Sequence, residues 1–210
     1  MQDVAYNTLL KTRRRELHQR VAHILQGQFP DTAVSAPELL AHHCTEAGLI
    51  AEAVRYWRKA GRKAVERTAN VEAIAQLSKG LDLIKTLPVT SERLMEEVKL
   101  QVALLTPLIA TKGYTAPQVE KACNQALDLC QQLGEVPQLF TVLGGLNSIY
   151  YNRGEFEISL ELAKRMLRLA QSRQDPVLLV WGHYALGFTL ASQGVWRSAR
   201  NHLEQSITFL

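Results

Sequence analysis

The chain has 210 residues, of which 47% are hydrophobic and 21% charged, a globular composition that argues against intrinsic disorder. The net charge is +4, and polar residues interrupt every apolar run before the roughly 18 residues that a membrane span needs, so no membrane protein is expected. The first fifteen residues carry their positive charges after the apolar stretch, the reverse of a secretory signal, and three cysteines are too few for a disulfide framework. These features favour a cytoplasmic location.

The first helix is predicted from one apolar stripe, and Gly27 and Pro30 are expected to end it. The stripe consists of Leu10, Leu17, Val21, Ile24 and Leu25. Pro37 is expected to open a second helix that stops at Gly48. Most of the net charge also lies in residues 1–30, which carry five basic and two acidic side chains.

Apolar residues recur at helical spacing along almost all of the remaining chain, and Gly or Pro separates the periodic segments. Helices are predicted at about 50–68, 70–86, 91–111, 116–133, 137–152, 155–172, 176–192 and 195–210. Their short connections favour antiparallel neighbours, so an all-α chain is expected.

Internal repetition indicates the architecture. Gly113, Gly154 and Gly194 recur 41 and 40 residues apart, each between two helical patterns, and similar flanking residues surround the last two. Small side chains allow two helix axes to approach closely, while larger ones fill the space beside them. The residues expected to pack the repeats are Leu40, Gly48, Ala53, Trp57, Ala60, Gly154, Leu186, Gly187, Gly194, Trp196 and Ala199.

This spacing resembles the tetratricopeptide repeat (TPR), although the period is near 40 rather than 34. The resemblance implies an antiparallel helix-hairpin α-solenoid, a TPR-like right-handed superhelix. The predicted helix 50–68 fits two adjacent hairpins, as the second member of one and the first of the next. Such sharing is expected in a solenoid, where each element buries its two faces against two neighbours.

In this repeat type the first helix of each hairpin lines a concave groove. For the last two hairpins the resemblance selects Thr141, Gly144, Ser148, Tyr151, Trp181, Tyr184 and Phe188, and the aromatic residues Tyr151, Trp181, Tyr184 and Phe188 are the candidate ligand contacts. This set lacks the basic residues that would clamp a peptide carboxylate. The alternative, that Trp181 and Phe188 bury against a neighbouring helix, stays open.

A second resemblance covers residues 3–26, DVAYNTLLKTRRRELHQRVAHILQ. The pattern VAY-x-x-LL, a basic run and then R-x-L-H-x-x-V-A is similar to the segment after the nucleotide-binding domain of bacterial STAND-type signalling ATPases, often associated with adenylate or guanylate cyclase domains. It implies that 1–30 is a basic helical segment resembling the end of a winged-helix region and that 31–210 contains TPR-like repeats truncated at the C-terminus. Lys11, Arg13, Arg14 and Arg15 are then candidate contacts to the absent ATPase domain, and a solvated helix face is the alternative.

No residue pattern indicates catalysis, a metal or a cofactor. The nearest match to a phosphate-binding loop, GLDLIKT at 80–86, lies inside a predicted helix, which has no free backbone N–H groups to offer. His42, His43 and Cys44 are consecutive on a helix and cannot converge on one ion, and His18 is expected to be unpaired. The carboxylates of the mixed-charge run at 96–97 are expected to be solvated.

The sequence therefore predicts a non-enzymatic protein-interaction or sensor scaffold of a larger signal-transduction regulator. Its expected partner is its own absent ATPase or output domain, another protein, or a small effector in the concave groove. Two alternatives remain: a fragment whose parent is an ATP-binding adenylate or guanylate cyclase or an ATPase, and a nucleic-acid binder acting through the basic helix, which the nearly balanced charge of the remaining chain disfavours.

Overall fold

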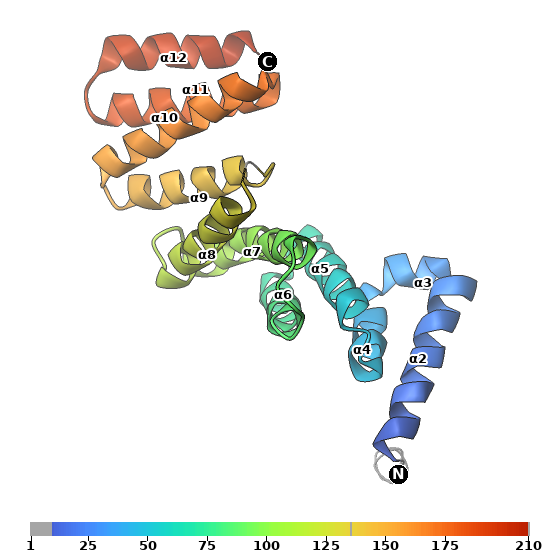
Figure 1. Cartoon of the computed structure of the whole chain (residues 1–210). Coiled ribbons are helices and arrows are strands. Elements are labelled where there is room, and N and C mark those ends of the chain that lie inside the picture. The colour runs from blue at the N-terminus through green and yellow to red at the C-terminus, as the bar shows by residue number, and fades with distance from the viewer. Residues whose placement is uncertain (1–9, 135, 210) are drawn as a thin grey trace. The chain divides into compact units, whose positions relative to one another are not determined.

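The computed structural model describes residues 10–134 and 136–209, and every regular element within these ranges is an α-helix (Figure 1). The chain forms two compact units, Met1–Pro107 and Leu108–Leu210. No helix among the described residues combines the length and the apolar composition that crossing a membrane would require.

The helix bounds follow the glycine and proline punctuation of the sequence closely. The first unit contains α2 (Lys11–Gln28), α3 (Pro30–Ser35), α4 (Pro37–Ala47), α5 (Ile50–Glu66), α6 (Asn70–Ile84) and the larger part of α7 (Ser91–Lys112). The second unit contains the end of α7 and then α8 (Pro117–Leu133), α9 (Leu139–Asn152), α10 (Phe156–Arg173), α11 (Pro176–Ser192) and α12 (Trp196–Thr208).

Helix α5 is the shared element of the first unit, because it packs against both α4 and α6 as the sequence predicted. Ala53, Trp57 and Ala60 are buried on it, and the Trp57 indole N–H donates to the Thr45 hydroxyl of α4 at 3.0 Å. On the α6 side, Leu77 lies directly against the α carbon of Gly61, so closely that a side chain at Gly61 would overlap it. Small residues thus set the distance between neighbouring helices.

In the second unit, α9, α10, α11 and α12 pack in chain order (Figure 1). A β carbon added to Gly187 would lie 2.8 Å from Leu203 Cγ and 3.0 Å from the Ala199 carbonyl oxygen. One added to Gly182 would lie 3.0 Å from the Leu167 α carbon of α10. Gly182 and Gly187 therefore allow α11 to cross α10 and α12 closely. The position of Gly187 opposite Ala199 agrees with the packing role predicted for both residues.

The repeat glycines close helices in the left-handed conformation. Gly48, Gly154 and Gly194 have φ of 75°, 77° and 78°, and after each one the next N–H bonds to the carbonyl five residues earlier, the Schellman arrangement. Thr68 makes the same turn with φ 59°, since Ala69 N–H bonds to the Ala64 carbonyl at 2.9 Å. The predicted break between the helices at 50–68 and 70–86 falls at this turn, but the glycine recurrence does not include it because threonine stands where the others have glycine.

The prediction that the apolar stripe of the first helix forms its packing face is wrong. On α2 the buried side chains are His18 and Ala22, whereas Leu17, Val21 and Ile24 are at least 36% exposed and Leu10 is 78% exposed. Helical spacing identifies a face of a helix but not its partner, and α4 packs on the neighbouring face of α2. Leu25 is partly buried against the first-unit core.

The expected end of the first helix also differs in detail. Gly27 lies within α2, which continues to Gln28, and Pro30 begins the additional short helix α3. A proline at the first helical position has no N–H that needs an intrahelical partner, so it can start a helix as readily as it stops one.

The packing role expected for Trp196 is a further correction, because its side chain is 70% exposed. Phe156 begins α10 at the equivalent position and contacts the Tyr151 ring at 5.5 Å between centroids, and Tyr151 is in turn covered by Phe188 of α11. In the described part of the chain no later helix covers Trp196 in this way.

Candidate functional site

An uncharged groove of about 810 Å³ lies in the second unit between α9 and α11. Fifteen residues line it, and none of them carries a charged side chain: Tyr114, Phe140, Thr141, Gly144, Asn147, Ser148, Tyr151, Asn152, Met166, Val177, Leu178, Trp181, Tyr184, Ala185 and Phe188. Its volume lies in the range of ordinary ligand sites, and apolar and aromatic groups predominate in its walls.

Four aromatic rings form a continuous ladder along the groove. The ring centroids of Trp181 and Tyr184 are 5.9 Å apart, those of Tyr184 and Phe188 are 5.6 Å apart, and Tyr151 of α9 lies 4.9 Å from Phe188. The spacing of 181, 184 and 188 places the three α11 rings on one helix face. Trp181 is 55% exposed, and Tyr184 and Phe188 are each more than 40% exposed, so the rings keep large areas available for contact.

Hydroxyl and amide groups fix the groove walls. The Tyr151 and Ser192 hydroxyls are 2.7 Å apart and link α9 to α11. Asn147, which lines the groove, donates from its amide to the Ser159 hydroxyl at 2.8 Å, and that hydroxyl lies 3.2 Å from the hydroxyl of Thr189. Ser159 and Thr189 are almost completely buried. This network joins α9, α10 and α11, which holds the aromatic ladder on a rigid base.

The structure brings together all seven residues that the repeat resemblance selected for the groove. Burial of Trp181 and Phe188 against a neighbouring helix, the alternative, is only partial, since 55% and 43% of their surfaces remain exposed. Whether the groove binds anything stays a prediction.

Sequence reasoning missed Tyr114, Phe140 and Met166 among the lining residues. Val177, four residues before Trp181 on the same helix face, could have been found by extending the aromatic spacing by one turn.

The candidate basic contacts lie at the start of α2. Lys11, Arg13 and Arg15 are exposed, and Arg13 pairs with Glu16 at 3.0 Å on the helix surface. The Arg15 guanidinium covers the turn at Gly48, where a β carbon would lie 2.8 Å from Nη2. Arg14 is partly buried. The VAY part of the second resemblance falls on residues 4–6, outside the described residues.

The histidines correct one expectation. His18 is not unpaired, because its Nδ1 lies 2.8 Å from Nδ1 of His43, 25 residues away on α4. A second such pair joins α11 to α12, with 3.0 Å between the Nδ1 atoms of His183 and His202. Burial lowers the pKa of all four imidazoles, so each pair is favoured in the neutral form. Among the described side chains no group of three or more metal-capable residues is placed to hold an ion.

Neither the cysteines nor the acidic pair has the character of a reactive group. Burial raises the pKa of Cys44 to about 11 and that of Cys123 to about 12, which disfavours the nucleophilic thiolate. The carboxylates at 96–97 are not solvated as expected: Glu96 bonds to both Arg58 at 3.2 Å and Lys99 at 2.6 Å, and Glu97 bonds to Arg93 at 3.1 Å.

Comparison with known proteins supports the fold. No family model matches the chain. An uncharacterized protein of Rhizobium meliloti (strain 1021) is 26% identical over 147 residues, and the match covers 69% of this chain but only 14% of that relative. The present chain therefore spans a small part of the length of this relative.

Solved structures match over nearly the whole chain. BtubC (BKLC) from P. vanneervenii has a TM-score of 0.66 at 13% identity, covering 95% of this chain and 87% of that one. A kinesin light chain-like protein from Podosopora anserina with nearly identical TPR-like repeats has a TM-score of 0.66 at 16% identity, covering 95% and 96%. The fold is a TPR-like helical repeat solenoid. The predicted all-α helix-hairpin class is confirmed.

Proposed function

We propose that this chain is a non-catalytic protein-interaction module whose ligand site is the uncharged aromatic groove between α9 and α11. The observation that carries the proposal is the ladder of Tyr151, Trp181, Tyr184 and Phe188, whose three α11 rings stay exposed although the members of the ladder contact one another. Aromatic residues are common in binding hot spots because they lose large apolar areas to a partner at little cost in side-chain entropy.

The groove chemistry defines the class of ligand. Its walls carry no lysine, arginine or carboxylate, so they provide no counter-ion for a peptide terminus or for a charged side chain. Asn152, Ser148 and Thr141 add donors and acceptors that can bond to a peptide backbone. The ligand is therefore an uncharged, apolar segment of another protein.

The signalling context is the finer part of the proposal. We infer that the module belongs to a STAND-type regulator and that α2 contacts the ATPase or output domain of that regulator. Exposed Leu17, Val21 and Ile24 lie on the same helix as the exposed cations Lys11 and Arg13, a combination that suits an acidic and apolar protein surface. Occupation of the groove would change helix stacking and so bias the attached domain.

The groove is tested by selecting peptides from a random display library on the purified chain and measuring their affinity for point variants. We expect uncharged peptides rich in Leu, Pro or aromatic residues, bound at least about tenfold more weakly by Trp181→Ala or Phe188→Ala, because each change removes a ring from the ladder.

Trp196→Ala is the matched control, since Trp196 is also an exposed tryptophan but lies outside the groove. It should leave the affinity unchanged. Peptides that bind the Trp181 and Phe188 variants as tightly as the parent chain, or a selection dominated by charged peptides, would contradict the proposal.

A further inference from the structure

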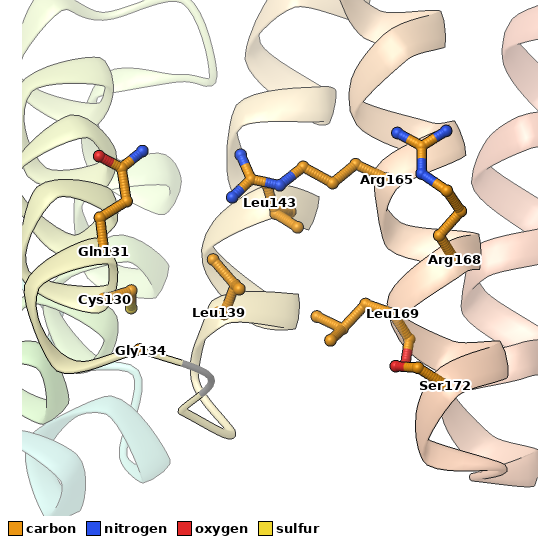
Figure 2. Close-up of a pocket in the computed structure, with 9 residues that line it drawn as sticks. All are labelled: Cys130, Gln131, Gly134, Leu139, Leu143, Arg165, Arg168, Leu169 and Ser172. Atoms are coloured by element: carbon orange, nitrogen blue, oxygen red, sulfur yellow. The ribbon is translucent and has the colours of Figure 1, made fainter.

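A second pocket, of about 460 Å³, lies between α8, α9 and α10 and shares no lining residue with the aromatic groove (Figure 2). Its apolar floor consists of side chains that are at least 91% buried within the protein: Cys130, Leu139, Leu143 and Leu169. Gln131, Arg165, Arg168 and Ser172 complete the lining together with Gly134. The pocket is therefore apolar at its base and polar at its edge.

The charges of this α8–α10 pocket have one sign. Arg165 and Arg168 extend toward the same end of the pocket as the Gln131 amide, with Arg165 the nearer of the two to Gln131 in this view, while Leu139 and Leu169 lie toward the other end (Figure 2). No carboxylate belongs to the lining, and among the described residues neither arginine forms an ion pair.

Arg168 does act electrostatically on Glu161, but the carboxylate of Glu161 is already bonded to Lys164 at 2.7 Å. Arg153 provides a contrast within the same unit, because it is held by Glu120 at 2.6 Å. The two guanidinium groups of the pocket thus differ from that of Arg153, because no described carboxylate bonds to them, and they place positive charge beside an apolar floor.

We propose that the α8–α10 pocket binds a small amphipathic carboxylate, with its head on Arg165 and Arg168 and its aliphatic chain over the leucine floor. Guanidinium groups bond to carboxylates through two parallel N–H donors, which gives them a geometric preference for this head group. The floor contributes by removing the chain from water. The pocket volume lies within the range of small-molecule sites, and the pocket is lined by three helices of one unit and open to solvent at its polar edge.

Isothermal titration calorimetry of the purified full chain with octanoate tests this site. We expect saturable binding with a dissociation constant of about 1 mM or tighter, and no detectable binding of octylamine, which has the same chain but a cationic head. The double variant Arg165→Gln/Arg168→Gln should weaken octanoate binding by at least about tenfold, because both head-group partners are lost.

The matched control is Arg197→Gln/Arg200→Gln, which removes the same net charge from exposed positions on α12. It should bind octanoate like the parent chain, and so should Trp181→Ala, which alters only the aromatic groove. Arg168→Glu adds a test by reversal: it should abolish octanoate binding and permit that of octylamine, with helical content unchanged by circular dichroism.

The proposal is overturned by absence of octanoate binding, by equal binding of octylamine, by unchanged affinity in the Arg165/Arg168 variant, or by loss of binding in Trp181→Ala, which would place the ligand in the groove.

Discussion

At the scale of single residues, the repeat turns depend on backbone conformation rather than on contacts. A β carbon at Gly154 would meet no atom within 4 Å, yet the backbone there has φ 77°. Gly194 repeats both features with φ 78°. The recurrence of glycine at these two turns is explained by the left-handed conformation alone, because an L side chain is strained in it even where space is available.

Gly154→Ala should therefore lower the free energy of unfolding by about 1–2 kcal/mol. Gly27 provides the control, since it too has open space around it but lies in helical backbone within α2. Gly27→Ala should leave the stability unchanged or raise it by roughly 0.5 kcal/mol. Urea denaturation followed by circular dichroism measures both, and equal effects of the two changes would refute the backbone explanation.

At the scale of elements, the two imidazole pairs connect adjacent helices. His18 joins α2 to α4 and His183 joins α11 to α12. In a neutral pair one Nδ1 donates and the other accepts, and this arrangement is lost when both rings carry a proton. Burial lowers the pKa at His183, with a smaller contribution from His202. At His18, Glu46 opposes the effect of burial, whereas His42 and Arg14 add to it.

The lowered pKa values of the paired histidines make the free energy of unfolding depend on pH. The unfolded histidines take up protons near pH 6.5, before the folded ones, so the folded state is favoured above this pH and loses stability as the pH falls below it. Each additional proton bound by the unfolded chain contributes at most about 1.4 kcal/mol per pH unit.

The prediction is that His202→Gln reduces the loss of stability between pH 7.5 and pH 5, measured by urea denaturation at each pH. Glutamine at this position can still hydrogen-bond but does not titrate. His23→Gln, at an exposed position on α2, is the control and should leave the pH dependence unaltered. A pH dependence that is identical in the parent chain and the His202 variant would exclude the pair as its source.

At the scale of the whole molecule, sequence reasoning succeeded where local chemistry decides the structure. Pro37 and Gly48 set the two ends of α4 directly, and the groove residues lie where the repeat resemblance placed them. Sequence reasoning failed for contacts between residues that lie far apart along the chain. The His18–His43 contact and the burial of α2 depend on which neighbour packs against a helix, and one helix's own periodicity carries no such information.

The same distinction explains why the α8–α10 pocket was not predicted. Cys130, Leu143 and Arg165 come from three helices, and each has an ordinary interpretation on its own helix as a packing or surface residue. Only their juxtaposition across the fold makes a cavity. The groove residues could be predicted because the repeat resemblance assigns them equivalent positions in successive hairpins. No comparable spacing relates Cys130, Leu143 and Arg165.

The fold also bears on the catalytic potential of the whole chain. The segment GLDLIKT at 80–86 is the one most similar to a phosphate-binding loop, and its residues 80–84 lie within α6. The N–H groups of Thr86 and Leu87 bond to the carbonyls of Leu83 and Ile84. A phosphate cradle requires backbone N–H groups that point toward the ligand, and these are already engaged.

We therefore expect the purified chain to show no hydrolysis of ATP and no cyclic nucleotide formation, measured by phosphate release and by mass spectrometry with magnesium present. Turnover that Lys85→Ala abolishes would contradict the non-catalytic assignment, whereas turnover that Lys85→Ala leaves unchanged would indicate a contaminating enzyme.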